Sequence, residues 1–399
     1  MRVHKISKRV HYIGVNDRTT ERFGSLWPLP VGVSYNSYLV EGPDKVAIID
    51  GVEVGHAMQQ IDAIKMILDG REPDYLIINH MEPDHSGAIR LLRQEFPRLT
   101  IVGNAQALSM VEGFYGVADN VMTVKEDDVL SLGADTTLSF VMTPMVHWPE
   151  TMMTYLREEE TVFAGDAFGC FGALNGAVVD SDMDVERYFP EMIRYYSNIV
   201  GKYGVFVQRA IKKLGSLKFG TVCPTHGPVW REHLDRVAGI YDSLSRYEPL
   251  DRGVTVVYGS MYGNTLRMAE AVADRLAAEG VRDIVFRNAA KDDLSYILAD
   301  LFTHAGVVFA APTYSDTIFP PVAAVIEAMA LRGLNNRLTA VVGEYTWAPQ
   351  AARKMTACLE ERGVTLVSEA VSAKQSPTAD VLGQCEAIAA ALAEKLKKD

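Results

Sequence analysis

The sequence has few cysteines, and none of them are closely spaced. Only four occur in 399 residues, at Cys170, Cys223, Cys358 and Cys385, and no two of them form a CxxC pair. Disulfide-stapled secreted domains and cysteine-ligated iron–sulfur or rubredoxin-type sites need closely spaced cysteines. We therefore expect reduced thiols, a cytoplasmic location and no cysteine-ligated cluster.

Long apolar runs and an excess of positive charge are also missing. No uninterrupted apolar stretch approaches the roughly 20 residues needed to span a bilayer. The basic N-terminus, MRVHKISKRVHYIGV, lacks the apolar core of a signal peptide. The formal net charge is −12, which argues against a nucleic-acid surface or a polybasic membrane patch. We expect a soluble protein that binds neither nucleic acid nor membrane.

The pattern of apolar runs changes near residue 250. YEPLDRG (247–253) is a short polar stretch with Pro and Gly, typical of a linker. We expect one domain at 1–249, a linker at 250–253 and a second domain at 254–399. The expected strands of the first domain are 46–50, 75–79, 100–103, 138–143, 151–156, 161–165 and 220–223, and those of the second are 254–258, 283–288, 307–311, 339–343 and 365–371.

The two halves differ in how strands and helices follow each other. Strands in runs with helices beside them predict a layered α/β domain with two sheets before the linker. After it, strands and helices alternate strictly, which predicts an open, five-stranded parallel sheet with helices on both faces.

Histidines and carboxylates follow four expected strands of the first half. Each of these four loops begins where an apolar strand ends, so the loops meet at one edge of a sheet. The loop NHMEPDHSG (79–87) alone offers four donors. The seven candidates are His80, Glu82, Asp84, His85, His147, Asp166 and His226. Seven donors exceed the four of a structural zinc and suit two metals that share a ligand. Taken singly, a loop histidine is more often a surface or packing residue, and the aspartates could cap helices or turns.

The loop GSMYGNT (259–265) joins the first strand of the second half to a helix. Backbone N–H groups and hydroxyls there can surround a phosphate at the helix N-terminus. The loop has neither GxGxxG nor the lysine of a P-loop. It resembles the phosphate loop of flavodoxins, which binds FMN; an ordinary strand–helix turn is the alternative. The candidates are Ser260, Met261, Tyr262, Gly263, Asn264 and Thr265.

Two later loops, 311–320 and 343–349, follow strands that end at the same sheet edge. Their aromatic residues suit the two faces of an isoalloxazine ring, although they could equally pack in the core. The candidates are Pro312, Thr313, Tyr314, Glu344, Tyr345, Thr346 and Trp347.

The motif HxExDH at 80–85, followed by His147, Asp166 and His226, resembles the metallo-β-lactamase superfamily. With a glutamate in this motif and a flavodoxin-like second half, the whole chain resembles the flavodiiron proteins, also called A-type flavoproteins. The resemblance extends to WPLPVGVSYNSYLV (27–40), HWP (147–149) and GDAFG (165–169). It implies an N-terminal metallo-β-lactamase-like αββα sandwich followed by a five-stranded parallel flavodoxin-like doubly wound domain.

Glu82 stands where a zinc hydrolase of this type carries a histidine. Zinc has no redox chemistry and accepts imidazole readily, whereas iron that cycles to the ferric state gains from anionic oxygen ligands. By resemblance, one iron is held by His80, Glu82 and His147, and the other by Asp84, His85 and His226. Asp166 bridges the two. In some members the histidine that matches His85 turns away from the metals.

The resemblance implies a reductase of O2 to water, of NO to N2O, or of both, with two non-haem irons and FMN. Electrons arrive from outside, through a rubredoxin or reduced coenzyme F420, since the chain ends after the last expected helix. A head-to-tail homodimer, or a dimer of dimers, places the flavin of one subunit beside the irons of the other. Tyr195 is a candidate proton donor, with core packing as its alternative role. The rival functions are a zinc hydrolase, against which Glu82 argues, and an electron carrier without catalysis.

Overall fold

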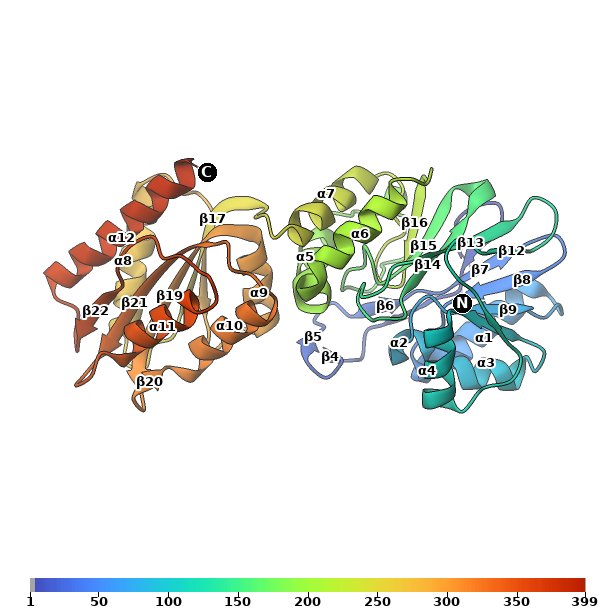
Figure 1. The fold of residues 1–399 in the computed structure, drawn as a ribbon, viewed down its shortest axis with the longest axis horizontal. Helices are drawn as coiled ribbons and strands as arrows, with labels where there is room; N and C mark the ends of the chain where they lie inside the picture. The colour runs from blue at the N-terminus through green and yellow to red at the C-terminus, as the bar shows by residue number, and fades with distance from the viewer. Residues whose placement is uncertain (1–3, 399) are drawn as a thin grey trace. The chain divides into compact units, whose positions relative to one another are not determined.

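The computed structural model describes residues 4–398, which form two compact units that divide between Asp242 and Ser243 (Figure 1). A strand already begins at Asp251, so most of the linker expected at 250–253 lies within a strand. The backbone oxygen of Tyr247 accepts a hydrogen bond from the Arg337 guanidinium, which ties that residue to the C-terminal unit. No helix in the described part of the chain is long and apolar enough to cross a membrane.

The N-terminal unit contains two sheets packed face to face. The seven-stranded sheet has the order β1 (His4–Lys5), β2 (Val10–Tyr12), β7 (Tyr38–Glu41), β8 (Val46–Ile49), β9 (Tyr75–Ile77), β10 (Thr100–Gly103) and β11 (Val121–Thr123). The five-stranded sheet has the order β12 (Val129–Ser131), β13 (Thr137–Met142), β14 (Met152–Leu156), β15 (Thr161–Gly165) and β16 (Thr221–Pro224). Tyr38 joins the sheets: its ring lies 5.4 Å from that of Phe163, and its hydroxyl donates to the Pro224 oxygen.

Helices cover the outer face of each sheet, so the unit has four layers (Figure 1). Along the first sheet lie α1 (Ala57–Leu68), α2 (Pro83–Ser86), α3 (Ile89–Glu95) and α4 (Ala105–Tyr115). Along the second lie α5 (Tyr188–Tyr195), α6 (Gly204–Leu214) and α7 (Leu234–Ser245). The spacing of Ile61, Ile64 and Leu68 places one apolar stripe of α1 on the sheet, and all three are buried. The αββα sandwich is thus confirmed.

Shorter elements complete this unit. Two small antiparallel pairs, β3 (Val15–Asp17) with β6 (Val33–Tyr35) and β4 (Arg22–Phe23) with β5 (Trp27–Pro28), lie in the chain between β2 and β7 of the seven-stranded sheet. Single helical turns are η1 (Val54–His56), η2 (Arg157–Glu159) and η3 (Asp180–Asp182). The helical region expected at 185–214 is interrupted between α5 and α6 by a π-helical turn, η4 (Tyr196–Val200), and by η5 (Gly201–Tyr203).

The C-terminal unit is a doubly wound parallel sheet. Its order is β18 (Ile284–Asn288), β17 (Asp251–Tyr258), β19 (His304–Tyr314), β21 (Leu338–Tyr345) and β22 (Val371–Lys374), the 2-1-3-4-5 order of flavodoxin-like folds. A two-residue strand, β20 (Thr317–Ile318), pairs antiparallel with β19. The helices are α8 (Asn264–Ala278), α9 (Leu294–Thr303), α10 (Pro320–Leu331), α11 (Gln350–Glu360) and α12 (Ala379–Lys398).

The expected last strand, 365–371, is wrong in position. The strand forms at Val371–Lys374, and the earlier segment makes only one bridge, between Leu366 and Thr339. Val371 and Ala373 alternate into the core under α12, whereas most of 365–370 stays partly or fully exposed. Burial against the helix therefore outweighs the β-propensity of the preceding residues.

Candidate metal centre and flavin loops

The loops after β9, β13, β15 and β16 bring all seven predicted ligands together in the N-terminal unit. The ligand atoms fall into two groups, and the atoms within each group lie within 4.8 Å of one another. The first group is His80, Glu82, His147 and Asp166, and the second is Asp84, His85 and His226. Each group draws side chains from both sheets, since the 80–85 loop follows the first sheet and the other three loops follow the second.

The first group is centred on the Nε2 atom of His147. That atom lies 3.0 Å from Glu82 Oε2 and 3.0 Å from Asp166 Oδ2. His80 Nε2 approaches the same two carboxylate oxygens at 3.5 Å. Two imidazoles and two carboxylates therefore point their ligand atoms at one small volume.

The second group uses the other oxygen of Asp166. His85 Nε2 lies 2.9 Å from Asp166 Oδ1 and 3.3 Å from Asp84 Oδ2, and His226 Nε2 lies 3.2 Å from Asp84 Oδ2. Asp166 thus presents Oδ2 to the first group and Oδ1 to the second, as a bridging carboxylate would. His85 therefore faces this group, and it is fully buried.

The donor set fits two metal ions better than it fits a hydrogen-bonded core. Buried polar groups are normally hydrogen-bonded, and exceptions call for an explanation. Here the close approaches lack hydrogen-bond geometry: His80 Nε2, both Asp84 oxygens, His85 Nε2, Asp166 Oδ2 and His226 Nε2 make no hydrogen bond in the described residues. A cation at each group would satisfy these atoms.

Neighbouring charges favour the ionised forms of Glu82 and His85, against the effect of burial. Burial opposes charge on Glu82, but its hydrogen bond to His147 and the nearby His80 imidazole keep the pKa of this carboxyl well below its usual value. Burial likewise opposes a charged His85, yet Asp84 and Asp166 raise its pKa to about 9. The His85 imidazole thus carries a proton that metal binding must release.

Residues behind the ligands fix their orientation, and the motif spacing did not reveal them. Glu150 is fully buried and accepts a hydrogen bond from His80 Nδ1 at 2.8 Å. Ser34 presents its backbone oxygen to His226 Nδ1 at 2.7 Å, and Thr225 Oγ1 donates to Asp166 Oδ1 at 2.6 Å. Thr225 and Glu150 lie one and three residues from predicted ligands, so closeness to a ligand was the only signal available.

Tyr195 lies at the end of α5, beside the second group. Its ring centroid is 5.5 Å from that of His226, and its buried hydroxyl has no hydrogen-bond partner in the described residues. Burial, then the charges of Asp166 and Glu82, raise the pKa of this phenol well above its ordinary value. Tyr195 therefore keeps its proton and holds an uncommitted donor near the cluster.

The three predicted flavin loops follow β17, β19 and β21 and meet at one edge of the C-terminal sheet. Gly263 precedes α8 with φ of +90° and offers no side chain to cap the helix, and its N–H donates to Ser260 Oγ at 3.1 Å. Ser260 Oγ also accepts the Leu266 N–H at 3.4 Å, and the other N–H groups of the first turn of α8 would be available to a phosphate. Asn264 begins α8, Thr265 is buried and Met261 is exposed.

Aromatic side chains project from these loops into solvent. Tyr262 is 89% exposed and Trp347 is 84% exposed, with Tyr314 at 43%, so none of the three is a core residue. Exposed aromatic surface of this kind suits the faces of a flavin ring better than packing does. The other candidates shape the loops. Pro312 pairs with Glu344 across β19 and β21, Thr313 Oγ1 accepts the Ala351 N–H, Tyr345 pairs with Lys374, and Thr346 is exposed.

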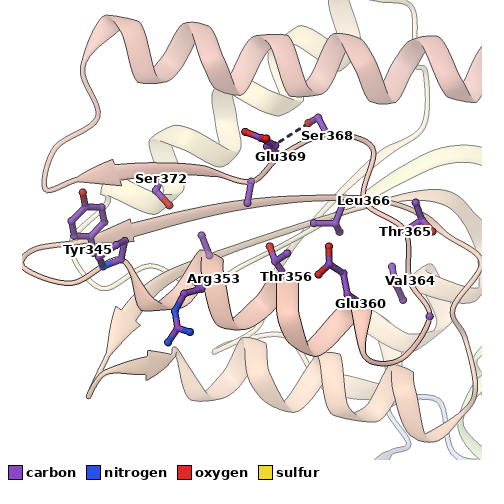
Figure 2. Close-up of a pocket in the computed structure, with 14 residues that line it drawn as sticks. Tyr345, Arg353, Thr356, Glu360, Val364, Thr365, Leu366, Ser368, Glu369 and Ser372 are labelled. Carbon is purple, nitrogen blue, oxygen red and sulfur yellow. Dashed lines mark hydrogen bonds between the residues drawn. The ribbon is translucent and has the colours of Figure 1, made fainter.

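A groove of about 950 Å³ runs beside this edge, between α11 and residues 363–372 (Figure 2). Tyr345 stands at one end, while Arg353 and Glu360 line the helical wall and Glu369 the opposite one. The displaced last strand creates this wall, since residues 365–370 do not continue the sheet. The groove carries charges of both signs and lies in the unit that lacks the metal cluster.

The chain matches two family models. Residues 33–227 match the ODP family beta lactamase, and residues 256–388 match the flavodoxin family. The first match covers the strands and loops that carry all seven ligands, and the second covers the three flavin loops. The flavodoxin domain implies FMN, and the buried cluster is that of a non-haem di-iron site.

Curated relatives match nearly the full chain. The anaerobic nitric oxide reductase flavorubredoxin of Vibrio vulnificus (strain YJ016) is 30% identical over 397 residues, covering 96% of this chain and 78% of the relative. The flavorubredoxin of Escherichia coli O1:K1 is also 30% identical, covering 95% and 80%.

Solved structures agree in fold. The rubredoxin oxygen:oxidoreductase of Desulfovibrio gigas has a TM-score of 0.94 at 26% identity, covering 100% of this chain and 99% of its own. The flavodiiron protein of Giardia intestinalis has a TM-score of 0.93 at 25% identity, covering 100% and 97%. A flavoprotein of Thermotoga maritima has a TM-score of 0.91 at 29% identity, covering 99% and 98%. With both domains matched in order and the metal ligands gathered as described, the chain belongs to the flavodiiron protein family.

Proposed function

We propose that this chain reduces O2 to water, NO to N2O, or both, at two irons held by the seven-residue cluster. The observation that carries the proposal is Asp166, whose two oxygens face two separate groups of ligand atoms. Relatives are named as nitric oxide reductases and as a rubredoxin oxygen:oxidoreductase, so we propose both NO and O2 as candidate substrates. Three carboxylates, Glu82, Asp84 and Asp166, favour iron that reaches the ferric state over zinc.

The electron count suits either gas. Bound iron would supply gas binding and one electron per metal, and reduced FMN two electrons more. Four electrons and four protons convert O2 to two waters, and two electrons with two protons convert two NO to N2O and one water. The protein's own task is to hold the ligand atoms, exclude bulk water and deliver protons. Tyr195 is the buried donor that we assign to proton delivery, supported by its unpartnered hydroxyl.

The flavin loops are proposed to hold FMN with its phosphate at the N-terminus of α8. Ser260 and Thr265 would face the phosphate, and Tyr314, Tyr345 and Trp347 would flank the ring. Electrons would come from an external donor, a rubredoxin or reduced coenzyme F420. A head-to-tail homodimer, alone or paired into a tetramer, would bring the flavin of one copy to the irons of the other.

We also propose a cytoplasmic location. All four cysteines are free in the described residues, and three are buried. Thiols in this state fit a reducing compartment.

Metal and flavin analysis of protein purified without oxygen tests the proposal. About two irons and one FMN per chain are expected, followed by O2 or NO consumption once the flavin is reduced chemically. Two zincs with little iron after growth in iron-replete medium would refute the di-iron assignment and favour a hydrolase. FMN without metal and without gas consumption would favour an electron carrier.

A further inference from the structure

Glu150 places a buried negative charge directly behind one predicted ligand. Its Oε1 accepts two hydrogen bonds, from His80 Nδ1 at 2.8 Å and from the Met81 N–H at 2.9 Å. Its Oε2 is buried and has no hydrogen-bond partner in the described residues. The side chain is fully buried, so water does not screen it.

In the second group no carboxylate within residues 4–398 is hydrogen-bonded to the far nitrogen of an imidazole; the buried Asp50 interacts with His85 only through its charge. His226 Nδ1 faces the neutral backbone oxygen of Ser34, and His85 Nδ1 makes no hydrogen bond in the described residues. The two groups therefore differ in whether a carboxylate is hydrogen-bonded to an imidazole on the side away from the metal, although they share Asp166. A carboxylate on the far nitrogen of a metal-bound imidazole fixes its tautomer and makes it a stronger donor.

We propose that Glu150 is a positioning residue that presents His80 Nε2 to the first metal and makes that metal harder to reduce than the second. The inference rests on the two-metal centre proposed above. A negative charge stabilises Fe3+ more than Fe2+, because the ions differ by one positive charge, and burial strengthens the effect. The first iron is then the one that favours the ferric state, and the second the one that favours the ferrous state.

The geometry of Glu150 allows charge and hydrogen bonding to be separated. In Glu150→Gln, the amide oxygen can take the place of Oε1 and keep both hydrogen bonds, while the NH2 group takes the place of the unpartnered Oε2. The variant therefore loses the charge and keeps the contacts to His80 and Met81. In Glu150→Leu, both the charge and the contacts are lost.

The test is a redox titration of the intact, iron-loaded protein, followed by the EPR signal of the half-reduced iron pair. For Glu150→Gln we expect two bound irons and one midpoint potential shifted positive. The shift should correspond to about a tenfold or larger change in the ferric-to-ferrous ratio, about 59 mV for one electron. Two irons with both potentials unchanged would overturn the proposal.

Metal binding gives a second, independent readout. Metal-free Glu150→Leu, titrated with Fe2+ against a chelator, should bind one of the two ions 10- to 100-fold more weakly, the usual effect of losing such a partner. Wild-type affinity for both ions would refute the positioning role. The matched control is Asp180→Asn, which neutralises another buried carboxylate whose partners, residues 231–233, include no predicted ligand.

The Asp180→Asn control should leave the midpoint potentials of both irons unchanged. A shift in this control as large as that of Glu150→Gln would overturn the assignment to Glu150. Wild-type protein that binds no iron would count against the proposed function itself. Iron-loaded wild type with an unaltered Glu150→Gln would count against this inference alone.

Discussion

Replacing Glu82 with histidine tests the central physical argument, that carboxylate charge selects redox iron over zinc. Glu82 Oε2 lies 3.0 Å from His147 Nε2 and 3.5 Å from His80 Nε2, so a metal bound by these imidazoles lies within about 4 Å of the carboxylate. The side chain is 24% exposed, so an effective dielectric constant of about 20 applies. At that distance, removing one negative charge changes the free-energy difference between the ferric and ferrous states of the metal by about 4 kcal/mol.

That energy corresponds to a roughly thousandfold loss of preference for the ferric state. Grown with equal iron and zinc, Glu82→His should contain more zinc than iron by elemental analysis, and its residual iron should have a more positive potential. Glu53→His makes the same change at a carboxylate outside the cluster and should keep the wild-type metal ratio. A Glu82→His protein with two irons and wild-type potentials would show that the carboxylate does not select the metal.

Four further predictions concern the flavin loop, the thiols, the metals and the phenol. Gly263→Val forces a β-branched residue to a φ of +90°, so stability should fall by about 1–2 kcal/mol in denaturant unfolding, and FMN content should fall with it. Native alkylation at pH 8 should label Cys358 alone, since the other three cysteines are buried, as peptide mass spectrometry can show. Metal-free protein should bind Fe2+ more tightly at pH 8 than at pH 6. Neighbouring carboxylates outweigh burial and raise the pKa of His85 to about 9. Protons therefore compete with Fe2+ for this imidazole more strongly at pH 6 than at pH 8. Tyr195→Phe should keep two irons and unfold no more easily, because its hydroxyl makes no hydrogen bond within residues 4–398, yet lose gas turnover; unchanged turnover would remove Tyr195 from proton delivery.

The sequence predicted the cluster because its ligands share one kind of position. His80, Asp166 and His226 each follow an apolar strand. The expectation that their loops share one edge of a single sheet was wrong, since β9 lies in the seven-stranded sheet and β15 and β16 lie in the five-stranded one. The partition into two groups came from the resemblance, and it matches the geometric grouping in the structure. Glu150 escaped notice because its partner, His80, is 70 residues away along the chain, and no local pattern marks that contact.

Boundaries were the weaker part of the prediction. The last strand was expected at 365–371 because of its β-branched residues, yet the sheet uses Val371 and Ala373, which fit beneath α12. The linker was read from Pro and Gly composition, but hydrogen bonds to Tyr247 and the early start of β17 at Asp251 shorten it. Such choices depend on packing between segments far apart in the sequence, which periodicity does not report.

Each metal group takes ligands from both sheets of the N-terminal unit, and this has a consequence for biosynthesis. The first group is incomplete until Asp166 has been made, and the second until His226 has been made. No nascent chain shorter than this can hold the full pair, and neither sheet alone can. Binding of the complete metal pair is therefore a late event that requires both sheets to have come together.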